Sequence, residues 1–226
     1  IAVVGCSGTG SPVIEQLVRL GVGELILVDD DHIEHRNINR ILNSTVADAE
    51  QQKSKPEMLA ATIHRIGLGT KVQVFNQNLW NREVVEAVAG CDIVFGCMYT
   101  LEGRFLLFSL ASYFLIPYFD LGVRLDAITD GESKGRIREV CGTVHYLQPG
   151  LSSLMSRGLV TMEGVQADGL RRRDPEAYGQ QLEDGYIRGV NEHRPAVISV
   201  NMFTASLAVN DLLSRLHAYR EMPNGL

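Results

Sequence analysis

The sequence predicts an α/β protein of the Rossmann-like, doubly wound class, with a mostly parallel sheet, an antiparallel extension and a buried C-terminal helix. Two observations predict this class. Short apolar runs of strand length alternate with segments of helical periodicity as far as residue 117. The first run ends in the glycine-rich turn GCSGTG at residues 5–10, which opens the first helical segment. Strand, glycine turn and helix in this order begin a βαβ unit.

The first βαβ unit follows from the spacing of apolar residues. Residues 1–4 form the first strand, and apolar side chains recur at helical spacing after Pro12. Gly21 and Gly23 end that helix. The continuous apolar run at 24–28 then predicts a parallel strand that is buried on both faces.

The same alternation continues through the middle of the chain. We expect helices at 56–66, 82–88 and 101–113, and strands at 71–75, 92–96 and from 117 onward. After Gly135 the alternation stops. Residues 136–147 predict a strand that extends the sheet in the antiparallel direction.

The last third of the chain divides into a polar and an apolar part. Residues 159–194 include three consecutive arginines at 171–173 and predict an exposed helical excursion or a mobile loop, either solvated or in contact with a partner. Pro195 marks the start of a helix that reaches Leu216 and is apolar on most sides. We expect this helix to be buried in the core or in a subunit interface.

Composition excludes several functional classes. A chain of 226 residues with 45% hydrophobic residues can bury a sizeable core, and we expect one domain over residues 1–226. The net charge of −6 argues against nucleic-acid binding, which needs a cationic surface. The four cysteines form no CxxC pair, which favours a reducing cytoplasm, and the apolar segments are too interrupted to span a membrane. Because residues 1–4 begin inside a strand, we expect a fragment of a longer protein.

The glycine turn and the end of the second strand predict a nucleotide site. Backbone N–H groups between a strand and a helix can hold a phosphate without a charged side chain. Ser7 replaces the second glycine of the usual dinucleotide pattern. Asp29 follows the second strand, 19 residues after Gly10, where a carboxylate commonly binds ribose hydroxyls.

An unusually polar segment follows Asp29 and predicts phosphate chemistry. Residues 29–40 read DDDHIEHRNINR. One interpretation is a metal cluster of Asp31, His32, Glu34 and His35, although adjacent residues rarely converge on one ion. The better interpretation makes Arg40 a phosphate clamp and Lys55, with Lys53 nearby, a point charge for a triphosphate.

Together these segments resemble the ThiF/MoeB/HesA family, the bacterial relatives of ubiquitin-activating enzymes. The family pattern is a glycine-rich loop, an acidic DxDxVExSNLNRQ-like segment and a downstream lysine, and the match covers residues 1–150. The resemblance implies ATP-dependent adenylation of the C-terminal carboxylate of a ubiquitin-like or sulfur-carrier protein by a homodimer. It implies that Gly5, Gly8 and Gly10 face the phosphates and that Asp29 faces the ribose. It implies that Asn37 and Arg40 reach the triphosphate. The catalytic lysine would be Lys55, or Lys53 in a second alignment.

Two departures from the family pattern limit what the resemblance implies. Tyr99 stands where the family places an aspartate that helps to hold Mg²⁺, and a neutral phenol is a poor ligand for a hard cation. Either Asp120 or Asp31 substitutes, or activity is reduced. Residues 149–158 carry serines where many relatives have two zinc cysteines, so we expect no zinc, and Mg²⁺ only with ATP.

Three functional hypotheses remain open from the residues. The preferred one is adenylation, in which the cations neutralise charge that builds on the α-phosphate and pyrophosphate. A thioester-forming cysteine is a further possibility in such enzymes, but Cys141 lies within a predicted strand. The alternatives are an NAD(P)-dependent oxidoreductase and a catalytically impaired scaffold that binds a carrier, the second because of Tyr99.

Overall fold

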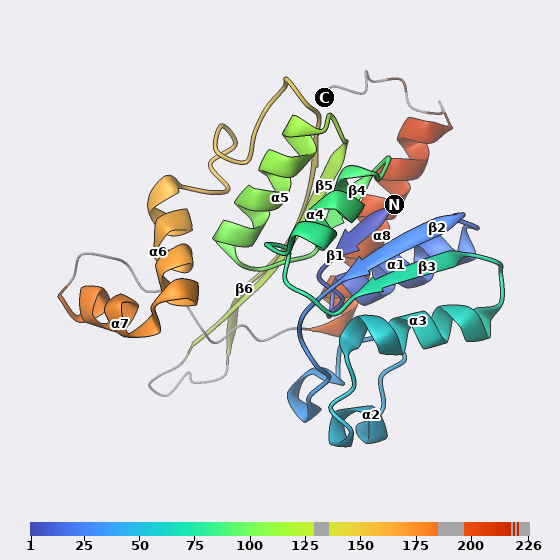
Figure 1. Ribbon diagram of the computed structural model, residues 1–226, viewed down its shortest axis with the longest axis horizontal. Helices are drawn as coiled ribbons and strands as arrows, with labels where there is room; N and C mark the ends of the chain where they lie inside the picture. The colour runs from blue at the N-terminus through green and yellow to red at the C-terminus, as the bar shows by residue number, and fades with distance from the viewer. Residues whose placement is uncertain (129–135, 185–196, 218, 220, 222–226) are drawn as a thin grey trace.

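A six-stranded sheet in the order β3-β2-β1-β4-β5-β6 forms the centre of the molecule (Figure 1). The computed structural model describes residues 1–128, 136–184, 197–217, 219 and 221. The strands are β1 (Ala2–Val4), β2 (Glu24–Val28), β3 (Lys71–Phe75), β4 (Val94–Gly96), β5 (Tyr118–Ala127) and β6 (Ile137–Leu147). Strands β1 to β5 pair in parallel, and β6 pairs antiparallel to β5. The predicted fold class is therefore confirmed, with its antiparallel extension.

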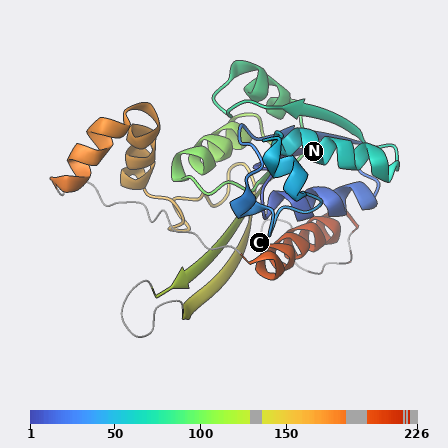
Figure 2. The same cartoon turned by 90° about the horizontal axis from the view of Figure 1, so that it is seen from below.

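Helices cover both faces of the sheet and enclose two apolar cores. One core contains side chains from α1 (Gly10–Arg19), α3 (Lys55–Ile66) and α8 (Ile198–Leu216). The other contains side chains from α4 (Arg82–Ala89) and α5 (Leu101–Tyr113). Figure 2 shows α1 and α8 side by side on one face. Because both faces of the parallel strands are covered, β1 and β2 read as continuous apolar runs.

Local sequence fixes where α3 begins and ends. Ser54 caps its N-terminus by accepting a hydrogen bond from the backbone N–H of Glu57, and Pro56 lies in its first turn. Gly67 ends the helix with φ of 72°, a conformation that glycine adopts at little cost. The start of α3 matters for function because it fixes the position of Lys55.

The polar excursion forms two helices. They are α6 (Met162–Arg173) and α7 (Pro175–Glu183), and they lie beside the sheet rather than on its core (Figure 2). Over these residues the excursion is helical, and α6 packs against the start of α5. The rest of the stretch, together with Pro195, lies outside the described residues.

The C-terminal helix is buried on one face only. Ala205, Ala208 and Val209 pack into the core, whereas Phe203 is 63% exposed and Leu207 is 44% exposed. The predicted burial of this helix is therefore confirmed for the face that packs into the core, and its opposite face is exposed in the single chain. Within the described residues, no helix is long and apolar enough to span a membrane.

Candidate active site at the carboxyl edge of the sheet

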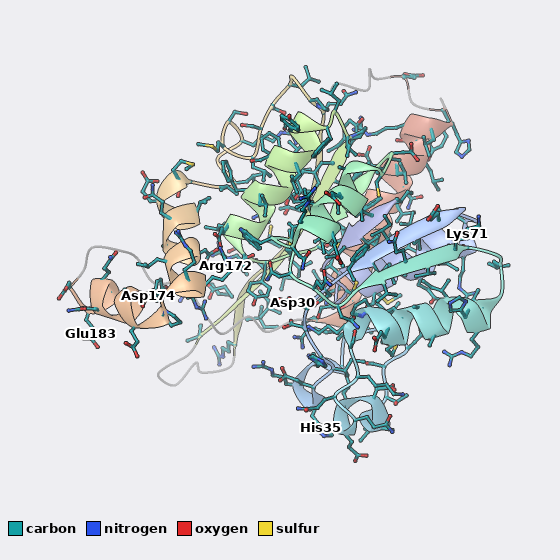
Figure 3. All side chains as sticks on the ribbon, in the orientation of Figure 1. Asp30, His35, Lys71, Arg172, Asp174 and Glu183 are labelled. Atoms are coloured by element: carbon teal, nitrogen blue, oxygen red, sulfur yellow. The ribbon has the colours of Figure 1, made fainter. Side chains whose placement is uncertain are left out.

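The site lies where the strand order reverses. β1 is flanked by β2 and β4. The connection from β1 to β2 carries α1 in one core, and the connection from β3 to β4 carries α4 in the other. Such a reversal creates a crevice beyond the carboxyl ends of the strands. Figure 3 labels Asp30 at this edge and Lys71 at the opposite end of the sheet. Three loops meet here: residues 5–9 after β1, residues 29–34 after β2, and residues 97–100 after β4.

The glycine loop is packed so tightly that its glycines are required by the protein itself. Gly5 has φ of 95°, and a Cβ atom on it would lie 2.8 Å from the backbone oxygen of Cys97. A Cβ on Gly10 would lie 1.8 Å from the backbone oxygen of Gly5. The loop therefore places the backbone N–H groups of residues 7–10 at the start of α1, and those of Ser11 and Val13 donate to the oxygens of Ser7 and Thr9.

Asp29 holds the glycine loop to the end of β2. One carboxylate oxygen accepts from the backbone N–H of Cys6 at 2.6 Å, and the other accepts from the N–H of Asp31 at 2.9 Å. Burial raises the pKa of Asp29, against the opposing effects of Lys55 and these two amides. Asp29 is thus placed at the expected strand end and also organises the loop.

The structure separates the two candidate lysines. The Lys55 side chain is 5% exposed, and its Nζ lies 2.6 Å from Oδ2 of Asp31 and 4.0 Å from Oδ1 of Asp29. Lys53 instead pairs with Asp48 at 2.6 Å, at the end of α2 (Val46–Glu50). Only Lys55 therefore belongs to the cluster at the carboxyl edge.

Acidic side chains surround Lys55. Oxygen atoms of Asp29, Asp30 and Asp31 lie within 4.8 Å of one another, and Lys55 balances one of their three negative charges. Carboxylate oxygens suit a hard divalent cation, so this donor set fits Mg²⁺. Beside it is a hollow of about 460 Å³ lined by Asp30, Asp31, His32, Glu34, Gln51 and Gln52.

Asn37 and Arg40 lie on the other side of the glycine loop. Asn37 is buried in the short helix η1 (His35–Asn37), and its Oδ1 accepts from the N–H of Glu34 at 3.0 Å. The stem of Arg40 packs over Gly8, and its Nη1 donates to the backbone oxygen of Arg36 at 2.8 Å. Burial and the neighbouring Arg36 lower the pKa of Arg40. An anion beside Gly8 would compensate for the burial of the Arg40 charge and for its repulsion by Arg36.

Tyr99 lies at the crevice, 65% exposed. The hydrogen-bonded carboxylate of Glu34 raises the pKa of Arg36, and Asp31 and Tyr99 raise it further. That Tyr99 occupies the position of a metal-binding aspartate stays a prediction.

Asp120 is engaged inside the protein. It is fully buried, its Oδ1 accepts from Arg104 Nε at 2.9 Å and from the Tyr118 hydroxyl at 2.8 Å, and its Oδ2 accepts from Arg104 Nη2. Burial alone would lower the pKa of Arg104, but the bonds to Asp120 outweigh it and raise it. This environment differs from that of the Asp29–Asp31 cluster and does not favour the predicted role of Asp120 in holding Mg²⁺.

The serine loop at 149–158 is closed by its own side chains. The N–H of Ser153 donates to Ser156 Oγ at 2.8 Å, and the N–H of Ser156 donates to Ser153 Oγ at 3.0 Å. Arg157 Nε also donates to Ser152 Oγ at 2.9 Å. The described part of this loop is therefore held by hydrogen bonds among its polar residues.

Sequence reasoning missed three residues that support the site. Arg104 orients Asp120, Asp168 accepts from the N–H of Leu101 at 2.5 Å, and Asn201 lies against the glycine loop. Arg104 and Asn201 are isolated polar residues inside apolar helices, a pattern that could have drawn attention to them. Asp168 carries no comparable signal, because its stretch is polar throughout.

Comparison with known proteins identifies relatives of the whole chain. A model of the ThiF family matches residues 1–223. The chain is 26% identical over 204 residues to ubiquitin-like modifier-activating enzyme 5 of Culex quinquefasciatus, covering 84% of this chain and 48% of that protein. It is 32% identical over 117 residues to SAMP-activating enzyme E1 of Haloferax volcanii, covering 52% of this chain and 43% of that protein. The chain thus spans about half the length of these relatives.

Solved structures share the fold at lower identity. Escherichia coli MccB with MccA-N7isoASN superposes with a TM-score of 0.70 at 19% identity, covering all of this chain and 58% of that one. MccB with ATP gives a TM-score of 0.62 at 20% identity, covering all of this chain and 57% of that one. At these identities the likeness establishes the fold.

Proposed function

The chain belongs to the ThiF family, and from this membership and its site we propose that it uses ATP to adenylate the C-terminal carboxylate of a ubiquitin-like or sulfur-carrier protein. The observation that carries the proposal is the position of Lys55. A buried ammonium group lies among carboxylates at the mouth of a glycine loop, where a triphosphate would need a cation. The names of the relatives, which include activating enzymes, and a neighbour solved with ATP support the same chemistry.

The proposed reaction assigns each group a charge-based role. A carboxylate oxygen of the carrier attacks the α-phosphorus of ATP, the bond from that phosphorus to the bridging oxygen of the β-phosphate breaks, and pyrophosphate leaves. Arg40 and Lys55 neutralise negative charge that develops on the phosphates. The amides of the glycine loop orient the phosphates, and Asp29 is positioned to accept from the ribose.

Mg²⁺, when bound with ATP, supplies further neutralisation of the triphosphate. Asp29, Asp30 and Asp31 are the residues that would hold it, because they offer the closest set of carboxylate oxygens at the site. In this arrangement Lys55 remains paired with the same carboxylates and limits repulsion between them.

An ATP–pyrophosphate exchange assay tests the proposal. We expect exchange of labelled pyrophosphate into ATP only when a suitable carrier protein and Mg²⁺ are both present. Carrier proteins encoded near the gene are the first candidates, because the two relatives are named for different carrier proteins. Absence of exchange from the full-length protein with every such carrier would refute adenylation.

A scaffold that binds a carrier without activating it is the second candidate, and Tyr99 favours it. Intact carrier binding with undetectable ATP binding would select the scaffold.

Binding of NADH in place of ATP would select the oxidoreductase. Separate titrations with ATP and NADH, followed through the fluorescence of Trp80, distinguish the adenylating enzyme, the scaffold and the oxidoreductase.

A further inference from the structure

Gly8 is the point where the glycine loop meets the C-terminal helix. A Cβ atom on Gly8 would lie 2.5 Å from Nδ2 of Asn201 and 3.1 Å from Cδ of Arg40. Asn201 belongs to the first turns of α8 and is 192 residues distant in sequence from Thr9, which its Oδ1 contacts. The amide of Asn201 therefore occupies the space into which any larger residue at position 8 would point.

The hydrogen bonding of Asn201 is incomplete. Its side chain is 2% exposed, and Oδ1 accepts from the Thr9 hydroxyl at 3.5 Å. Nδ2 is buried and has no hydrogen-bond partner in the part of the chain that the structure describes. A buried donor without a partner is rare and costly, which raises the question of what it binds.

An anion is the acceptor that the surroundings favour. Asn201 lies beside the N-terminus of α1, where the helix dipole attracts negative charge. Within the described residues, the backbone N–H groups of residues 7–10 have no acceptor, whereas those of Ser11 and Val13 donate to the oxygens of Ser7 and Thr9. The Cγ and Cδ atoms of the cationic Arg40 side chain lie on the same side of Gly8. Asn201, the glycine loop and Arg40 thus meet at one small region, and none of the three is acidic.

Arg40 packs on the same glycine. Its Nη1 donates to the backbone oxygen of Arg36 at 2.8 Å and to Oδ1 of Asn39 at 3.1 Å, which holds its stem over Gly8. An arginine drawn toward a phosphate would leave these acceptors. Its stem would then move away from Gly8, beside which Nδ2 of Asn201 lies.

We propose that Asn201 is a nucleotide-binding residue, with Nδ2 donating to a phosphate oxygen of ATP beside Gly8. The inference rests on the proposed function, because it assumes that the glycine loop binds ATP. It adds a donor from α8 to a site otherwise built from the first 100 residues of the chain. The class of ligand is a nucleoside polyphosphate, and a nucleoside without phosphate would not contact Asn201.

The substitution Asn201→Asp tests this donor with little change in shape. An aspartate retains an oxygen that accepts from Thr9 and replaces only the donor with a charged acceptor. We expect the Kd for ATP, measured by calorimetry on the complete chain, to rise by about tenfold or more, and the Kd for adenosine to stay unchanged. Asn201→Ala removes the donor without adding charge and should weaken ATP binding less, again without an effect on adenosine.

Asn210→Asp is the matched control on the same helix. Asn210 is exposed, and its Nδ2 donates to the backbone oxygen of Ser206 at 2.9 Å, so this variant should bind both ligands as the parent does. If Asn201→Asp does not fold, Asn201→Ala carries the test.

Each other result overturns the inference. Unchanged ATP affinity in the Asn201 variants would show that Nδ2 makes no contact with phosphate. Equal losses for ATP and adenosine would assign Asn201 to loop packing alone. A parent protein that binds neither ATP nor adenosine would refute the proposed function itself. This outcome differs from one in which the parent and the Asn201 variants bind ATP equally well.

Discussion

At the scale of single residues, Lys55 shows how the site handles buried charge. An ammonium group that is 5% exposed would be costly without a partner, and Asp31 at 2.6 Å provides one. The pairing depends on backbone contacts between two segments. The N–H of Ile33 donates to the oxygen of Lys53 at 2.8 Å, and the N–H of Lys55 donates to the oxygen of Asp31 at 3.2 Å. These contacts place the ammonium group of Lys55 beside Asp31.

The two lysines should respond differently to substitution. Lys55→Ala should lower the rate of ATP–pyrophosphate exchange about a hundredfold, equivalent to about 3 kcal/mol in the transition state, because it removes a cation beside the phosphates. Arg40→Ala should have a loss of similar size. Lys53→Ala is the control, since Lys53 pairs with Asp48 away from the site. Normal exchange by Lys55→Ala together with a large loss for Lys53→Ala would reverse the assignment.

Tyr99→Asp tests whether position 99 faces the metal. If it does, the new carboxylate should raise the exchange rate and lower the Mg²⁺ concentration needed for half of that rate. If Asp29, Asp30 and Asp31 already hold the metal, added negative charge beside a triphosphate should weaken ATP binding instead.

The measurement for Tyr99→Asp is the exchange rate as a function of Mg²⁺ concentration, with Tyr99→Phe as the uncharged control. An identical curve for all three proteins would show that position 99 is remote from the metal.

Asp48 makes stability depend on pH. The hydrogen bond from Lys53, and then that from Thr45, lowers the pKa of Asp48 in the folded protein. A carboxylate with a depressed pKa stabilises the fold above its unfolded pKa of about 3.9, and this stabilisation is lost as pH falls through the lower folded value. Asp48→Asn should therefore have a lower Tm than the parent at neutral pH.

The difference in Tm between Asp48→Asn and the parent should shrink once the pH is below about 3. Circular dichroism melts across the acid range measure it, and Glu50→Gln, on the exposed side of α2, is the control. A difference of constant size down to the lowest pH would show that the charge of Asp48 does not stabilise the fold.

At the scale of elements, α6 packs against the start of α5, the helix that begins two residues after Tyr99. Asp168 is buried and caps the first residue of α5, and Arg172 binds both oxygens of Glu102, at 2.9 Å and 3.1 Å. Gly164 and Gly169 of α6 allow this close approach, because a Cβ on either would come within 3.0 Å of Leu101 or Glu102. Figure 3 shows Arg172 on α6, with Asp174 and Glu183 farther along the excursion.

This joint should position the loop that carries Tyr99. Asp168→Ala should lower the free energy of unfolding by about 1 kcal/mol and also raise the KM for ATP, because α5 loses its cap beside the crevice. Asp174→Ala is the matched control: Asp174 accepts from the N–H of Ala177 at 3.0 Å, but it caps α7, which lies away from the site. Urea unfolding and exchange kinetics separate the two effects. An equal KM in both variants would refute a positioning role for α6.

At the scale of the whole molecule, α8 presents apolar side chains that the described part of the chain leaves exposed. Ile198, Met202, Phe203 and Leu207 are each at least 39% exposed. Clustered exposed apolar residues often mark an interface, and most homo-oligomers are twofold dimers. We therefore predict a homodimer that uses α8.

Phe203→Glu should convert this dimer to a monomer, because it would bury a charge without a partner. Light scattering at micromolar concentration measures the mass. Leu68→Glu is the control, since Leu68 is 56% exposed in the loop between α3 and β3. A parent protein that scatters as a monomer would refute the interface for this chain.

The sequence by itself determined the elements and much of the site. Apolar runs and helical periodicity are local, so the strands at 24–28 and 71–75 and the helix at 101–113 have the bounds that the residues predict. The bounds of two other strands differ from the expected ones. β4 begins at Val94 and not at residue 92, and β6 begins at Ile137 and not at residue 136. Gly5, Asp29 and Lys55 were singled out because they belong to short motifs. Gly5 and Asp29 follow strands and Lys55 begins α3, and their roles at the site stay predictions.

Tertiary structure alone decided which polar groups meet. The choice of Lys55 over Lys53 depends on Asp31 and Asp48, which lie on different segments, and the engagement of Asp120 by Arg104 depends on packing of α5 on β5. Asn201 reaches Gly8 only because α8 returns to pack on α1. Such contacts join residues far apart in the chain, and a hydrogen bond depends on distances of a few tenths of an ångström, which no periodic pattern along the sequence encodes.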